Sequence, residues 1–71
     1  MLTSYFDSDK IGANIKHLIK ESKYPSQEKF AKACGKDLRT VSRWIEHGVD
    51  SIVVINKIAR VLEVDVRAIL F

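Results

Sequence analysis

Two short helical patterns lie so close together in this chain that their connection limits the fold more than any other feature. Apolar residues recur every three or four positions in both patterns: Phe30, Ala31 and Cys34 in the first, and Leu38, Val41, Trp44 and Ile45 in the second. Only Gly35, Lys36 and Asp37 separate the two patterns. Glycine adopts the left-handed backbone that commonly ends a helix, and Asp37 can accept hydrogen bonds from the amides that open the next helix. So short a connection predicts that helix 27–34 and the helix ending near Gly48 cross steeply, as in a helix-turn-helix.

A longer amphipathic pattern precedes this pair. Its apolar members have the spacing of one helix face: Ile11, Ile15, Leu18 and Ile19. We expect a helix over about 9–22, with Ser8 or Asp9 as its N-cap. Pro25 prevents that helix from continuing, and Ser26 can cap the start of the next one.

The remainder of the chain also follows helical spacing. Ser51 can cap a segment whose apolar residues recur as on a helix face: Ile55, Ile58, Ala59 and Leu62. The β-branched run 52–55 also fits a buried strand, but no other segment offers a partner strand, so a helix is preferred. Asp65 resembles the N-cap of a last short helix that ends at Phe71. The expected fold class is all-α, with about five short helices.

Length and composition exclude several classes of protein. The 71 residues fit one domain, expected over 9–71 after an N-terminal segment 1–8. The chain lacks the long apolar run of a secretion signal or a membrane span, so we expect a cytoplasmic protein. Cys34 is the only cysteine, and neither it nor His17 and His47 has zinc-ligand spacing, so we expect no metal and no cofactor. The sequence contains no paired carboxylates, no nucleophile with a base and no phosphate loop, so we do not expect an enzyme.

Positive charge is concentrated in one half of the chain. Twelve basic and nine acidic residues give a net charge of +3. Residues 10–43 hold nine of the basic and three of the acidic residues, whereas the remaining residues carry a net charge of −3. Lysines also solvate ordinary helix faces, but this asymmetry can attract a polyanion to one side of a small domain.

Many residues of this chain occur at positions that are typical of one known helix-turn-helix family. The central matches are Ser26-Gln27-Glu28, Phe30-Ala31, Gly35, Arg39-Thr40-Val41-Ser42-Arg43-Trp44 and Gly48. The flanking matches are Ile11-Gly12, Ile15-Lys16, Leu18, Ile55, Ile58-Ala59, Leu62, Val64-Asp65 and Ile69-Leu70. Over about 10–71 the sequence therefore resembles the lambda-repressor/Cro-like (XRE-type) helix-turn-helix family. The resemblance implies a fold like that of the lambda repressor and binding of duplex DNA through the major groove, as in a prokaryotic or phage repressor. Lys36, Ile45 and the longer loop at Gly48 depart from the family pattern.

Helical geometry divides the third helix into an inner and an outer face. Leu38, Val41, Trp44 and Ile45 share one arc, which we expect to be buried. Arg39, Arg43, Glu46 and His47 lie opposite. The two arginines are like charges four residues apart, which repel unless an anion lies against them. With the resemblance, this face defines the candidate DNA-binding set: Gln27, Lys36, Asp37, Arg39, Thr40, Ser42, Arg43 and His47. Lys29 and Lys32 are added as candidate phosphate contacts.

Two other functions fit the same residues. An antitoxin-like or anti-repressor module would use this fold mainly to bind a protein, and a purely structural module would leave the positive stretch unexplained. Apolar residues near both termini also suggest a homodimer: Leu2, Tyr5, Phe6, Ile69, Leu70 and Phe71. For Cys34 and Trp44 we expect packing in the core.

Overall fold

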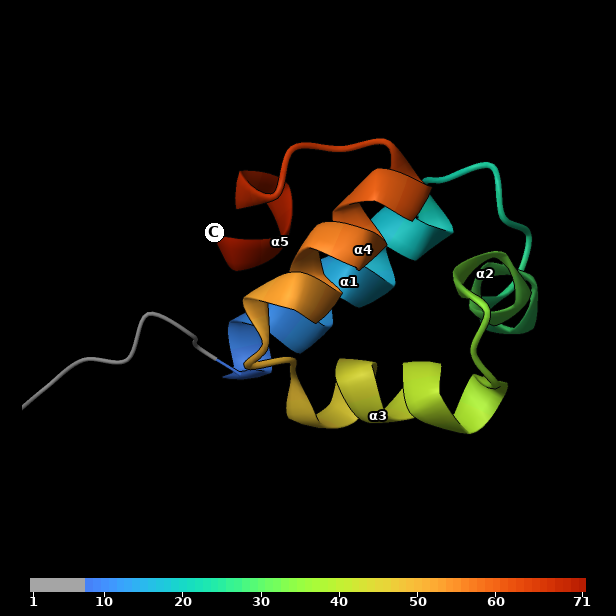
Figure 1. Ribbon diagram of the computed structural model, residues 1–71, viewed down its shortest axis with the longest axis horizontal. Helices are drawn as coiled ribbons and strands as arrows, with labels where there is room; N and C mark the ends of the chain where they lie inside the picture. The colour runs from blue at the N-terminus through green and yellow to red at the C-terminus, as the bar shows by residue number, and fades with distance from the viewer. Residues whose placement is uncertain (1–7) are drawn as a thin grey trace, which may run out of the picture.

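The computed structural model describes residues 8–71 and folds them into five helices (Figure 1). They are α1 (Ser8–Lys20), α2 (Gln27–Cys34), α3 (Leu38–His47), α4 (Ile52–Leu62) and α5 (Arg67–Leu70). The β-branched run 52–55 forms the first turn of α4, where Ser51 accepts a hydrogen bond from the Val54 amide. No strand occurs within residues 8–71, and the expected all-α class with five helices is confirmed.

Helix α1 begins and ends earlier than its pattern predicts. Ser8 and Asp9 are both helical, so neither is the cap that we expected. At the other end, the Ser22 hydroxyl donates to the Ile19 carbonyl at 2.7 Å and accepts from the Tyr24 amide at 3.1 Å. The Ser22 amide donates to the same Ile19 carbonyl at 3.0 Å, so both the side chain and the backbone of Ser22 close the end of α1, and the chain leaves the helix at Lys20.

The predicted signals around α2 are confirmed. Ser26 has an extended backbone, and its side chain accepts an amide of the first turn at 3.2 Å. Gly35 ends the helix in the left-handed conformation, with φ +71°, and its amide donates to the Lys32 carbonyl at 3.0 Å. The Lys36 amide donates to the Ala31 carbonyl at 2.9 Å. These bonds close the end of α2 and turn the chain sharply toward α3.

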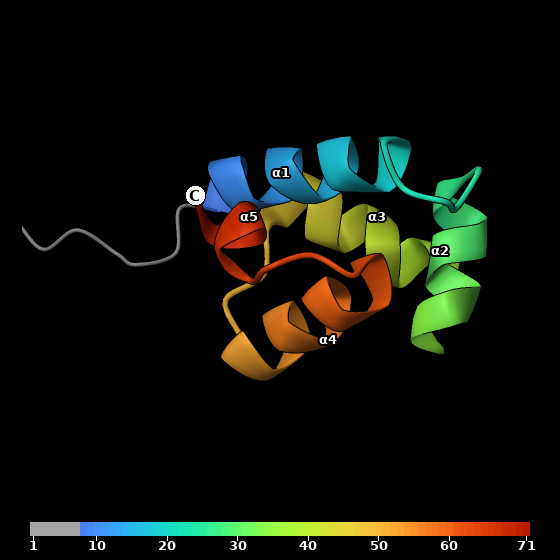
Figure 2. The same ribbon diagram turned by 90° about the horizontal axis from the view of Figure 1, so that it is seen from above.

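The crossing of α2 and α3 is steep, as the short connection predicts. In Figure 1 α2 is seen nearly along its axis, whereas α3 runs across the lower edge of the molecule. Figure 2, turned by 90°, shows α2 lengthwise at one end, with α1 and α4 on opposite sides of the core. The outer side of α3 therefore faces away from the other helices.

One apolar core joins the five helices. Its fully buried large side chains are Ile11, Ile15, Phe30, Val41, Ile55, Ile58 and Ile69. Cys34 belongs to this core, with 2% of its surface exposed, as expected. Phe30 is held from outside by Tyr24, whose ring lies 5.7 Å from it in an edge-to-face arrangement. The hydroxyl of Tyr24 donates to the Val61 carbonyl at 3.3 Å, which ties the loop after α1 to α4.

A glycine on α1 allows α3 to approach closely. Gly12 is buried, and a Cβ atom at this position would collide with the carbonyl oxygen of Ile45 on α3. Backbone cannot move aside as a flexible side chain can, so only glycine permits this contact. Gly48 has a similar constraint, because φ is +77° and a Cβ atom would lie 2.5 Å from the Ser8 carbonyl oxygen.

Four expectations about burial need correction. Leu38 is 43% exposed instead of buried, because it is the first residue of α3 and its side chain points back beyond the end of the helix. Trp44 and its neighbour Ile45 are only partly buried, although both pack against the core. Ile69 is fully buried and not a free terminal residue, and Asn14 of α1 donates a 2.8 Å hydrogen bond to its carbonyl. Leu2, Tyr5 and Phe6 lie outside the described residues.

Candidate nucleic-acid interface

The outer face of α3 carries the centre of the predicted site. Arg39, Arg43 and His47 are exposed there, and Thr40 and Ser42 are half-buried at its edges. Within residues 8–71, neither guanidinium forms an ion pair or a hydrogen bond. Both arginines therefore keep all their donors available to a partner, at a spacing where the two charges repel each other.

The start of α3 is fixed by Asp37 and Thr40. One carboxylate oxygen, Oδ1 of Asp37, accepts from the Thr40 amide at 2.9 Å and from the Thr40 hydroxyl at 2.7 Å. The hydroxyl bond, followed by the amide bond, holds the pKa of Asp37 below its ordinary value. Because its proton is already donated, the Thr40 hydroxyl meets a partner as an acceptor. Asp37 and Thr40, both members of the predicted site, thus cap the first turn of α3.

Gln27 lies at a second part of the candidate surface. It is the first residue of α2 and lines a hollow of about 340 Å³ between the end of α1 and the start of α2. Lys16 and Lys20 of α1 line the same hollow, with Tyr24 and Ser26. Their ammonium groups and the amides at the start of α2 favour a negatively charged group here. The sequence set omitted both lysines, although their spacing of four residues on the outer side of α1 was visible.

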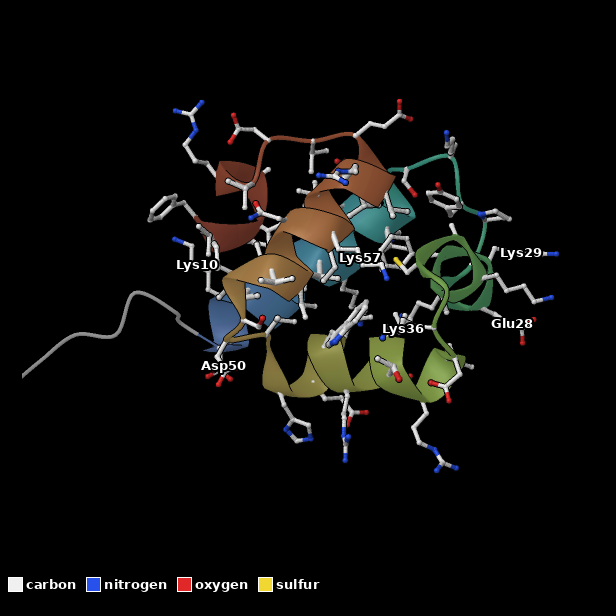
Figure 3. All side chains as sticks on the ribbon, in the orientation of Figure 1. Lys10, Glu28, Lys29, Lys36, Asp50 and Lys57 are labelled. Atoms are coloured by element: carbon white, nitrogen blue, oxygen red, sulfur yellow. The ribbon has the colours of Figure 1, made fainter. Side chains whose placement is uncertain are left out.

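The other predicted lysines are spread over different sides of the α2–α3 pair. Figure 3 shows Lys29 pointing away from the other helices, next to Glu28. Lys36 lies on the side where α4 presents Lys57, and both charges act on the thiol of Cys34. Burial nevertheless raises the pKa of that thiol. The structure therefore does not bring Lys29 or Lys36 onto the outer face of α3.

A second hollow lies beside the turn between α2 and α3. It has a volume of about 370 Å³ and is lined by Glu28, Ala31, Lys32, Lys36, Asp37 and Leu38. Lys32, a predicted phosphate contact, is exposed at this hollow. The lining mixes both signs of charge with two apolar side chains, one of which is Leu38.

Residues 8–71 show neither a metal-binding cluster nor a membrane-spanning helix. In residues 8–71 no group of three or more His, Cys, Asp or Glu side chains is placed to hold a metal ion. No helix in that range is both long and apolar enough to cross a membrane. The exposed polar groups of α3 are the guanidinium groups of Arg39 and Arg43, the His47 imidazole and the Glu46 carboxylate, one oxygen of which lies 3.8 Å from His47 Nε2. The two guanidinium groups bind acceptors and negative charge.

The chain matches no protein-family model, no curated protein and no solved structure. The function must therefore be inferred from the chemistry and placement of its own residues.

Proposed function

We propose that this protein binds duplex DNA sequence-specifically as a transcriptional repressor of prokaryotic or phage type, with the fold and mode of action of the lambda-repressor/Cro-like family. In this proposal α3 lies in the major groove and its outer face contacts base edges. No catalytic step and no cofactor is involved, and the protein acts in the cytoplasm, where its DNA target lies.

The observation that carries the proposal is the pair of unpartnered arginines on the outer face of α3. Arginine donates two parallel hydrogen bonds to guanine O6 and N7, which is the commonest specific contact between a protein and a base. Arg39 and Arg43 are exposed on a helix that crosses α2 steeply and whose outer side faces away from the remaining helices. A partner rich in acceptors and negative charge best explains two such donors held side by side.

Phosphate contacts would position α3 in the groove. The hollow that holds Lys16, Lys20 and Gln27 adjoins the start of α2, and Lys32 lies at the other hollow, beside the start of α3. Contacts of this kind fix the register of a protein on DNA without selecting a sequence. Lys29 and Lys36 contribute to the general positive field around the same two helices.

We further propose that two copies pair on DNA. A single module of this size contacts too little surface for strong discrimination, about 600–1,000 Å². The end of α3, the start of α4 and the C-terminus lie at the same end of the molecule (Figure 1). Val53 and Phe71, which are 74% and 73% exposed, belong to that end. A twofold axis there would place two α3 helices on one face of the duplex, about 34–36 Å apart.

The rival function is an antitoxin-like or anti-repressor module that binds a protein. The two functions differ in their response to salt. Each phosphate contact releases counterions, so the logarithm of the DNA association constant falls by about 0.9 per contact for each unit in log salt concentration. An interface built on apolar contacts changes little with salt.

The proposal is tested by selecting bound sequences from random duplex DNA and measuring affinity for the selected site between low and high salt. We expect enrichment of a defined, partly palindromic site and a steep fall in affinity as salt increases. If no sequence is enriched, the proposal is wrong, and a protein partner becomes the better explanation of the exposed groups.

A further inference from the structure

Leu38 is an exposed apolar side chain at the first position of α3. It is 43% exposed, and among the large apolar side chains that residues 8–71 leave exposed it alone belongs to the α2–α3 pair. The others, Ile52, Val53 and Phe71, lie on α4 or at the C-terminus. Packing in the core therefore does not explain why a leucine occupies this position.

The place of Leu38 in the helix determines what it can reach. It is the first residue of α3, between the capping Asp37 and the exposed Arg39. Helical side chains tilt toward the N-terminus, so the leucine projects past the end of α3 that carries the cap. In a helix that enters the major groove by its N-terminal end, the residues of this turn lie nearest to the base edges.

The surroundings of Leu38 favour a small apolar partner over a large one. The hollow that it lines contains one other apolar residue, Ala31, and four charged residues: Glu28, Lys32, Lys36 and Asp37. An apolar helix or strand of a protein partner would have to bury these charges at a cost. One methyl group presented among polar groups fits the same surface without that cost.

We propose that Leu38 recognises the C5-methyl group of a thymine and makes the chain specific for thymine at the base pair facing the start of α3. This inference rests on the proposed DNA binding. The thymine methyl is the apolar group that a base pair displays in the major groove, where it distinguishes thymine from cytosine. Leu38 is thus a specificity residue that acts by apolar contact, beside arginines that act by hydrogen bonds.

The test replaces each thymine of the selected site, one at a time and on both strands, with deoxyuridine, which lacks only the methyl group. Burying one methyl group corresponds to a change of about fourfold in affinity. We expect one thymine in each half-site at which deoxyuridine weakens binding of the wild-type protein by about that factor. Leu38→Ala should bind the two duplexes equally, and Leu38→Met, which keeps an apolar side chain, should retain the preference.

Val64→Ala is the matched control, because it also truncates a partly exposed apolar side chain but lies in the connection between α4 and α5, outside the α2–α3 pair and outside the proposed dimer contact. It should keep the thymine preference of the wild-type protein, and circular dichroism should show that all three variants fold. If deoxyuridine has no effect at any thymine, or if Leu38→Ala shows the same loss as the wild type, the inference is overturned while DNA binding stands. If the wild-type protein enriches no duplex at all, the proposed function itself fails.

Discussion

At the scale of single residues, the candidate site is defined by groups that the rest of the molecule leaves without a partner. Arg39 and Arg43 are exposed, four residues apart on α3, and neither forms an ion pair or a hydrogen bond within residues 8–71, although the charge of Arg39 also acts on the Asp37 carboxylate. Ion pairs do form elsewhere, for example between Lys23 and Glu63 at 3.1 Å and between Arg67 and Asp65 at 2.9 Å. Exposed basic side chains elsewhere, for example Lys29, Lys57 and Arg60, also form no ion pair, so the outer face of α3 is distinguished by two guanidinium groups held four residues apart on one helix.

We expect Arg39→Ala and Arg43→Ala each to weaken binding to the selected site without unfolding the protein. A lost bidentate contact to guanine corresponds to about 1–3 kcal/mol, and the loss should depend on particular base pairs. Affinities for the selected site and for its single-base variants provide the measurement. Arg60→Ala on α4 removes a comparable exposed charge and should change affinity equally for all sequences, if at all. Unchanged affinity in both α3 variants would remove these arginines from the site.

Substitution of a buried glycine, unlike substitution of the arginines, should affect the stability of the fold. Gly12→Ala should lower the free energy of unfolding by about 1–3 kcal/mol, since the new methyl group overpacks against the Ile45 carbonyl. Without that collision, alanine would stabilise α1 by about 1 kcal/mol relative to glycine. Urea denaturation measures the change. A Gly12→Ala protein more stable than the wild type would show that α1 and α3 do not approach as described.

At the scale of elements, the first turn of α3 is stabilised by its N-terminal cap. Asp37 accepts two hydrogen bonds from Thr40, and these bonds lower the pKa of the carboxyl group. A carboxyl group with a lowered folded-state pKa stabilises the fold above its ordinary pKa of about 3.9. That contribution is lost as the pH falls through the folded-state pKa.

We therefore expect Asp37→Asn to remove part of the acid sensitivity of the protein. Asparagine can still cap the helix, but it does not titrate. The difference in unfolding free energy between the wild type and the variant should shrink as the pH falls from about 5 toward 3. Asp65, whose pKa is lowered to about 2 by its hydrogen bonds from Arg67, acts in both proteins and cancels in the comparison. A difference that is constant with pH would contradict the role assigned to the Asp37 carboxylate.

At the scale of the whole molecule, apolar and charged surfaces lie at different places. The exposed apolar residues Val53 and Phe71 lie at the end where α4 begins and α5 ends, whereas α2 occupies the opposite end (Figure 1). The outer face of α3 connects the two ends. This separation lets one surface contact a second copy while another contacts DNA.

We expect Val53→Glu to weaken self-association, because two copies would each bring a charge into an apolar contact. Sedimentation of the free protein, and of the protein on its selected site, should show the loss of dimer. Ala33→Glu on α2 adds the same charge at an exposed position near the opposite end, and it should leave the sedimentation of the free protein unchanged. A wild-type protein that stays monomeric at high concentration and binds an asymmetric site one to one would rule out the pairing.

Much of the helical architecture was already determined by the sequence, because its signals are local. Ser26, Gly35 and Asp37 cap or end helices through hydrogen bonds to residues within four positions along the chain. Such bonds form whatever the distant parts of the chain do, so residue type and spacing suffice to predict them.

Only the tertiary structure decided which residues meet across the fold. The hollow lined by Lys16, Lys20 and Gln27 lies between two helices. The backbone that would collide with a side chain at Gly12 is more than thirty positions away in the sequence. Leu38 has the spacing of a buried residue, but α3 begins there and no neighbouring element covers it fully. Helical periodicity indicates which side of a helix is apolar. The exposure of a residue on that side depends on which other segments pack against it, and the pattern within one helix does not specify those segments.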